Sequence, residues 1–120
     1  MGYDLDFWKY ESEPGNGFNH QDVYEKLSDG KVVTGLETLP INNILSRISD
    51  VFESDGWHKL DELNWESENG AFQIFTTSQF VRIDCYGMNG DDMNKFIDVA
   101  TEFGCPLYDP QVGNRFTISS

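Results

Sequence analysis

Positive charge is scarce in this chain of 120 residues. Eight lysines and arginines stand against 21 aspartates and glutamates, which gives a formal net charge of −13. A surface this acidic repels phosphate backbones and argues against direct binding of nucleic acid. The same electric field attracts and steers cationic molecules, so a basic protein is the natural partner of this chain.

Long apolar runs, targeting signals and clustered cysteines are also lacking. No run approaches the ~18 apolar residues that span a bilayer, and the residues after Met1 are acidic where a secretory signal carries basic ones. We therefore expect a cytoplasmic protein without membrane association. Two cysteines are too few for a disulfide scaffold. Cys85 and Cys105 are expected to be reduced core residues, although a bridge between them or a reactive thiol remains open.

Motifs for phosphate binding, metal binding and catalysis are not found either. A glycine-containing turn at residues 87–90 precedes a predicted helix, but Asp91 and Asp92 follow where a phosphate would dock. His20 and His58 have no ligand partner one helical turn away, and no acidic stretch has the spacing of a calcium loop. We expect no cofactor, no metal site and no enzyme activity.

Aromatic residues are plentiful and provide the bulk for one folded domain over residues 1–120. Alternation of apolar and polar residues predicts strands over 3–10, 71–77 and 80–86, with weaker candidates at 106–108 and 115–119. Helical spacing predicts helices over 19–30, 40–52 and 90–104, and residues 53–70 are predicted to form an irregular acidic connection. This order favours an α+β fold, a ferredoxin-like sandwich with a mainly antiparallel sheet of about four strands and two to three helices on one face.

The acidic connection is the first candidate for a binding surface. Its carboxylates suit a basic partner, and a buried aromatic anchor supplies most of the energy of many interfaces. Two tryptophans in the same segment are candidate anchors, although they could equally fill the core beneath a long loop. The candidate residues here are Glu53, Asp55, Trp57, Asp61, Glu62, Trp65, Glu66 and Glu68.

The sheet face that the helices leave open is the second candidate. If Leu5 and Phe7 point into the core, alternation directs Asp4, Asp6 and Trp8 to the other side. Arg82 and Asp84 are costly to bury, so they are expected on the same open face. The partner-binding candidates here are Asp4, Asp6, Trp8 and Asp84; the alternative is a solvated face with Trp8 partly covered.

Three stretches carry a family resemblance: YDLDFWK at residues 3–9, the pair Val23 and Tyr24, and LYDPQ at residues 107–111. With these the chain resembles small acidic bacterial immunity proteins of contact-dependent inhibition and related toxin systems. The resemblance implies a cytoplasmic, monomeric inhibitor that binds a cognate toxin domain, often a basic nuclease, and covers its active site or substrate-binding surface. It transfers no catalytic or toxin-facing residue to this chain. A small-ligand or regulatory domain, or an enzyme, is the alternative.

Overall fold

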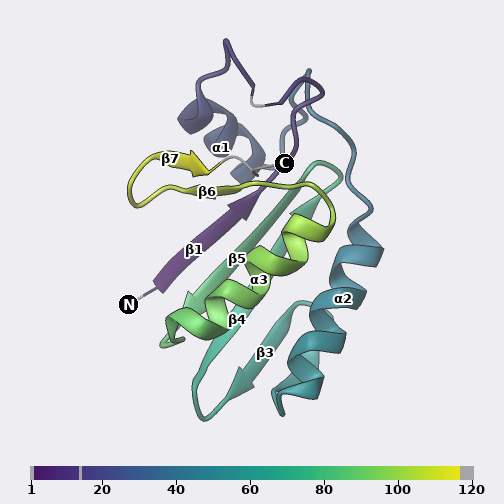
Figure 1. Cartoon of the computed structure of the whole chain (residues 1–120), viewed down its shortest axis with the longest axis vertical. Coiled ribbons are helices and arrows are strands. Elements are labelled where there is room, and N and C mark those ends of the chain that lie inside the picture. The colour runs from purple at the N-terminus through teal and green to yellow at the C-terminus, as the bar shows by residue number, and fades with distance from the viewer. Residues whose placement is uncertain (1, 14, 117–120) are drawn as a thin grey trace.

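The computed structural model describes residues 2–13 and 15–116, which contain three helices and seven strands. In chain order the elements are β1 (Gly2–Phe7), α1 (His20–Ser28), α2 (Ile41–Ser54), β2 (His58–Asp61), β3 (Asn64–Ser67), β4 (Gly70–Thr77), β5 (Phe80–Tyr86), α3 (Gly90–Glu102), β6 (Leu107–Asp109) and β7 (Asn114–Phe116). The strands form one antiparallel sheet in the order β2-β3-β4-β5-β1-β6-β7 (Figure 1).

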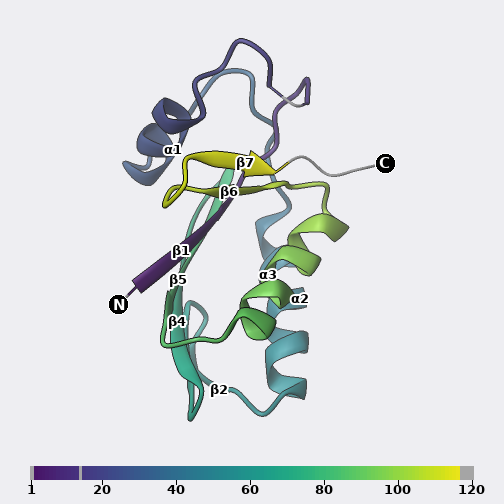
Figure 2. The same cartoon turned by 60° about the vertical axis from the view of Figure 1, so that its left-hand side comes forward.

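The α+β class and the antiparallel sheet agree with the sequence prediction, but the sheet is larger than predicted. It has seven strands rather than about four, and a ferredoxin-like arrangement is not confirmed. The helices also divide between the two faces of the sheet. Helices α2 and α3 lie side by side on one face, whereas α1 lies on the other side near one end of the sheet (Figure 2).

The larger core lies between the sheet and helices α2 and α3. Helix α2 contributes Ile44, Ile48 and Phe52, which recur at helical spacing and are all buried. Phe52 stacks on Phe96 of α3 with ring centroids 4.6 Å apart. Helix α3 begins as predicted, because the Asn89 side chain accepts a hydrogen bond from the Asp92 amide.

A second, aromatic core lies beneath α1. Trp8 and Tyr10 continue the alternation of β1 beyond its last residue and pack with Phe80 and Tyr108. Leu27 of α1 closes this cluster from outside and is fully buried. Helix α1 packs on the side of the sheet opposite α2 and α3, because these aromatic side chains form an apolar surface there.

The main error of the sequence prediction concerns residues 53–70. They are not an irregular connection: the end of α2 is followed by the hairpin of β2 and β3, which extends the sheet beyond β4. Trp65 fixes this hairpin to the core by stacking on Phe72, with ring centroids 5.8 Å apart. The tight connection from β3 to β4 requires Gly70, whose φ is 129° and whose Cβ would lie 2.6 Å from the Tyr86 carbonyl oxygen.

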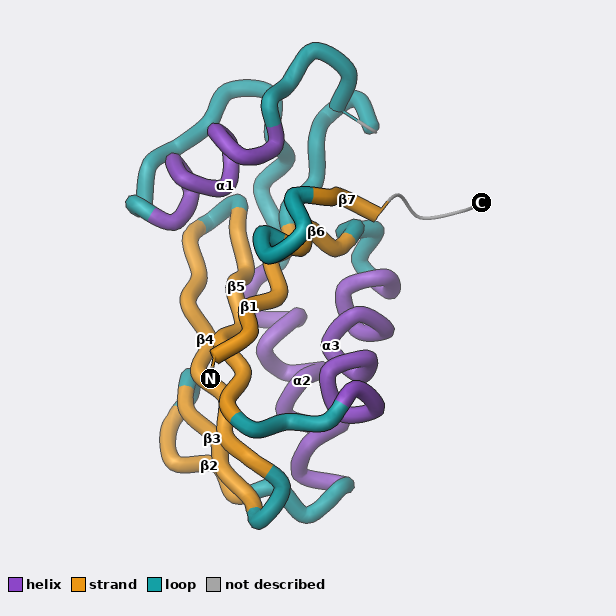
Figure 3. Tube along the Cα trace, turned by 90° about the vertical axis from the view of Figure 1, so that its left-hand side faces the viewer, coloured by secondary structure: helices purple, strands orange, loops and turns teal. Residues whose placement is uncertain are grey.

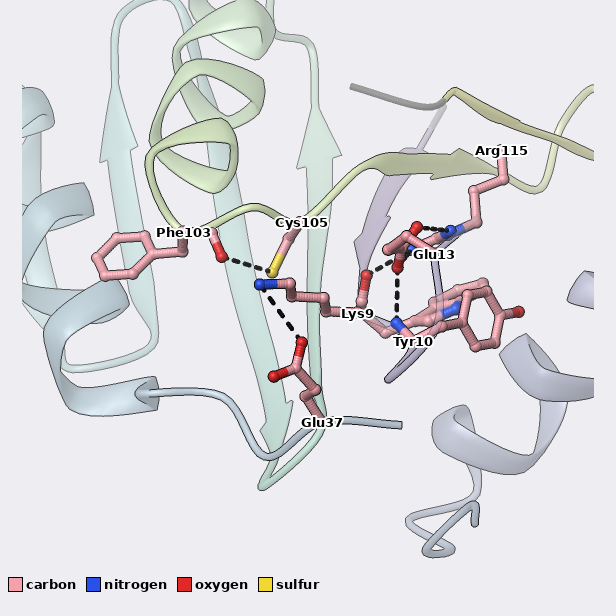
Figure 4. A network of polar contacts seen from close by, with 8 residues as sticks. Lys9, Tyr10, Glu13, Glu37, Phe103, Cys105 and Arg115 are labelled. Atoms are coloured by element: carbon pink, nitrogen blue, oxygen red, sulfur yellow. Dashed lines mark hydrogen bonds and ion pairs between the residues drawn. The ribbon is translucent and has the colours of Figure 1, made fainter. Parts of the chain in front are cut away.

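The hairpin of β6 and β7 is fastened to the loop after β1 by Arg115 (Figure 4). Its guanidinium donates to both carboxylate oxygens of Glu13 at 2.7 and 2.8 Å and to the Trp8 carbonyl at 2.8 Å. It also lies over the Tyr10 ring, 4.5 Å from the centroid. The side chain is almost fully buried, so this contact couples the C-terminal strands to the aromatic core. Strand β7 overlaps the predicted strand at 115–119 over residues 115 and 116, and residues 117–119 are outside the described range.

The prediction for the cysteines is confirmed, since Cys85 and Cys105 are both buried free thiols. None of the three described helices is long and apolar enough to cross a membrane.

Candidate protein-binding face

The side of the sheet away from α2 and α3 is called the outer face here. Leu5 and Phe7 point into the larger core, so Asp4 and Asp6 point to the outer face, as the alternation predicts. Arg82 lies opposite Asp6 and Asp84 lies opposite Asp4 in the antiparallel register of β5 and β1. Figure 3 shows α1 above this side of the strands and no described helix over its lower part.

Cross-strand pairing brings both predicted acidic segments onto this face. Residues directly opposite each other in antiparallel strands point to the same side of the sheet. The register therefore places one residue from each of five neighbouring strands in a line that we call the acidic row: Asp61, Asn64, Gln73, Asp84 and Asp4. Adjacent members are separated by about 4.8 Å, the spacing between paired strands.

A parallel line runs beside the acidic row. It contains His58, Glu66, Ala71 and Tyr86 in register. Glu66 is exposed, and Tyr86 has 47% of its surface exposed. The outer face thus combines carboxylates with amides and one accessible aromatic ring, a combination that suits recognition of arginine and lysine side chains.

The electrostatic centre of the outer face is Asp6. The pKa of this carboxyl is raised from 3.8 to about 10, mainly by burial and in addition by the neighbouring Asp4. Arg82 lowers the pKa but does not compensate for these effects. At neutral pH Asp6 is therefore an uncharged acid next to Asp4, whose Oδ2 accepts a 2.9 Å hydrogen bond from the Tyr24 hydroxyl. Burial and this bond raise the pKa of Tyr24 above its ordinary value.

Four of the predicted partner-binding residues are not on the surface. Trp57 and Trp65 belong to the larger core, so they fill space beneath the hairpin rather than anchor a partner. Asp6 and Trp8 were predicted on an open face and are both 0% exposed, because α1 and the aromatic core cover this end of the outer face. None of these four side chains forms part of the exposed surface in this conformation.

The other predicted acids are accessible but do not form one surface. Glu66 and Asp61 share the outer face with Asp4 and Asp84, as described above. Glu62 and Glu68 are exposed in the turns at the two ends of β3. Glu53 and Asp55 lie at the end of α2 in the helical layer, where Asp55 pairs with Lys95 of α3.

Sequence reasoning missed the polar residues that complete the outer face. Gln73 alternates with the buried Phe72 and Ile74 in β4, so the strand pattern was sufficient to place it there. Asn64 and Tyr24 had no such signal. Their places follow from the hairpin of β2 and β3 and from the folding of α1 onto the outer side.

A separate hollow of about 560 Å³ lies between the start of α2 and the turn from β4 to β5. Its lining offers amide and hydroxyl groups with a few apolar side chains: Leu39, Pro40, Ile41, Asn42, Asn43, Thr76, Thr77 and Ser78. Because none of these lining side chains is an acid or a base near neutral pH, this hollow supplies no group for proton transfer. Across the described residues, no group of three or more His, Cys, Asp or Glu is arranged to hold a metal ion.

Comparison with protein-family models, curated proteins and solved structures finds no match for this chain. The geometry and charge of the outer face are therefore the features that bear on function.

Proposed function

We propose that this protein is a stoichiometric inhibitor of the immunity type, which binds a cationic toxin domain through its outer face. The observation that carries the proposal is the acidic row, in which carboxylates from β1, β2 and β5 line up across the sheet. The formal charge of −13 extends the attraction beyond the contact surface. The inhibitor acts as a monomer in the cytoplasm.

A row of carboxylates can take the place of a nucleic-acid backbone in a basic groove. A nuclease groove presents cations at positions that suit successive phosphates, and carboxylates on neighbouring strands offer negative charges on a rigid support. Long-range attraction speeds association, and the contact excludes substrate from the groove. No catalytic group is needed for this activity.

The first experiment is a pull-down with the whole chain as bait from lysate of its own source, including the product of the neighbouring reading frame, at low and moderate salt. Recovery of one basic polypeptide in an equimolar complex supports the proposal. Recovery of nothing by a monomeric bait contradicts it and favours a small-ligand domain, for which the hollow beside α2 is the place to look.

The surface assignment is tested with two charge-matched double variants. Glu66→Gln with Gln73→Lys changes the outer face, whereas Glu53→Gln with Asn94→Lys makes the same changes in the helical layer. All four positions are exposed. We expect the outer-face variant to weaken toxin binding at least about tenfold and to flatten its salt dependence, with a much smaller effect of the control. Equal effects of the two variants would refute the assignment to the outer face.

A further inference from the structure

Asp6 is a buried carboxyl without an ordinary partner. The residue is 0% exposed, and no described group donates a hydrogen bond to either of its carboxyl oxygens, although the protonated acid can itself donate one to Asp4. Its nearest polar neighbour on the same strand is the carboxyl of Asp4. Buried polar groups in native proteins are nearly always satisfied, so an oxygen without a described donor beside the partly exposed Asp4 points to a missing partner.

The charged and titratable groups that face this carboxyl come from every element packed around it. They are Asp4 on β1, Arg82 and Asp84 on β5, Tyr24 on α1 and Tyr108 on β6. Three carboxyls thus share one guanidinium. The cluster has an excess of acceptors that a second cationic group would complete.

Arg82 does not satisfy this excess. Its Nε lies 3.4 Å from the Asp84 Oδ1, which is longer than a well-formed hydrogen bond, and this buried nitrogen has no hydrogen-bond acceptor among the described residues. Its guanidinium lies over the Phe75 ring instead, 4.8 Å from the centroid. Asp6 therefore gains charge compensation from Arg82 without a hydrogen bond.

Access to the cluster is from the outer face, through Asp4 and Asp84. These residues lie directly opposite each other on neighbouring strands and both are partly exposed. The Tyr24 hydroxyl holds Asp4 in place, and the exposed Tyr86 ring lies two residues beyond Asp84 on the same face. An incoming side chain would meet the carboxylates of Asp4 and Asp84 at the surface, with the buried Asp6 two residues from Asp4 on the same face.

We propose that Asp4, Asp6 and Asp84 form a subsite that anchors one arginine side chain of the cationic partner, an inference that rests on the proposed function. A planar guanidinium can bridge two carboxylates and stack on a tyrosine ring, and its weak hydration suits a partly buried position. The ammonium group of lysine lacks these paired planar donors and is more strongly hydrated. The subsite thus selects arginine over lysine.

The selectivity is tested by calorimetric titration of the whole protein with capped nona-arginine and nona-lysine peptides at pH 7. We expect nona-arginine to bind more tightly, and Asp84→Asn to weaken its binding about tenfold and remove the preference. The control Asp98→Asn removes the same charge from an exposed position on α3 and is expected to change the affinity less than about twofold. Equal affinities of the two peptides for the wild type, or equal effects of the two variants, would overturn the subsite.

A second measurement is the release of the Asp6 proton when the peptide binds. At pH 9 this carboxyl, with its pKa of about 10, is still mainly protonated, and an arriving guanidinium favours its ionisation. Titration with nona-arginine in buffers of different ionisation enthalpy should therefore show proton release by the wild type. Asp6→Asn should release none, and equal proton release by the two proteins would exclude Asp6 from the subsite.

The subsite and the proposed function can fail separately. If the peptides behave as expected but no cationic protein is recovered from the source, the arginine subsite stands and the immunity function fails. If a toxin domain is recovered and Asp84→Asn binds it as tightly as Asp98→Asn does, the function stands and the subsite is refuted.

Discussion

Replacing Asp6 by asparagine should stabilise the protein at neutral pH, although it alters a buried residue of the sheet. The asparagine side chain would have nearly the same shape and could donate a hydrogen bond to Asp4, as a protonated acid can. The pKa of Asp6 is about 10 in the folded protein and 3.8 ordinarily. Between these values folding takes up a proton. The contribution of Asp6 to the free energy of unfolding is therefore most favourable below pH 4 and falls as the pH rises towards 10.

The magnitude at pH 7 follows from the interval between the ordinary pKa of 3.8 and this pH. Each pH unit in that interval corresponds to about 1.4 kcal/mol, so keeping Asp6 protonated costs about 4 kcal/mol at pH 7. Asp6→Asn should recover up to this amount. Between pH 5 and pH 7 its advantage over the wild type should grow by about 3 kcal/mol.

Urea unfolding at pH 5, 6 and 7 measures this effect through the fluorescence of the three tryptophans, all of which are buried. Asp98→Asn serves as the control for the loss of a carboxyl at an exposed position. A stability difference between Asp6→Asn and the wild type that stays constant from pH 5 to pH 7 would refute the assignment of Asp6 as a buried neutral acid.

Three further changes test other parts of the structure. Arg115→Ala should reduce the free energy of unfolding by about 3 kcal/mol, because it leaves the Trp8 carbonyl without this donor and Glu13 with only the Tyr10 amide among the described donors; urea denaturation measures it, and a loss below about 1 kcal/mol would contradict the role of this contact. Asn89→Ala removes the cap of α3 and should cost about 1 kcal/mol in the same assay, whereas a neutral result would show that the cap is dispensable. Burial raises the pKa of Cys85 to about 12 and that of Cys105 to about 11, so neither thiol should react with iodoacetamide at pH 8 until urea unfolds the chain; mass spectrometry would detect early alkylation, which would argue against burial.

Those parts of the fold that depend on local pattern were predictable from the sequence. The strands β4 and β5 agree with the predicted ranges to within one residue, and α2 and α3 agree to within two at either end. Their signals are strong because each element has a regular apolar face of buried residues. In the structure Asn19 and Asn89 cap α1 and α3, since each side chain accepts a hydrogen bond from the amide three residues further on.

The hairpin of β2 and β3 was not predictable in the same way. Strand β2 is at the sheet edge and has no buried residue, while β3 buries only Trp65. Neither strand therefore shows an alternation long enough to recognise. The burial of Asp6 was equally hidden, because a charged residue in a half-buried strand is ordinarily assigned to the open side, and only the folding of α1 onto that side covers it.

A β-bulge explains how the acidic hairpin joins the rest of the outer face. The pair of Lys59 and Trp65 would, in a regular ladder, be followed by Leu60 opposite Asn64. The register instead shifts by one residue, and Asp61 takes the place opposite Asn64 at the end of the acidic row. Asp61 is held there by hydrogen bonds from the Leu63 amide at 2.8 Å and the Asn64 side chain at 2.9 Å. These bonds lower the pKa of Asp61 and favour its charged form.

One extra residue in an edge strand thus exchanges a leucine for a carboxylate on the outer face. The exposed Leu60 in that place would have ended the acidic row with an apolar side chain. Bulges commonly redirect a side chain at a sheet edge near a functional site. The bulge therefore completes the charged surface that we propose for partner binding.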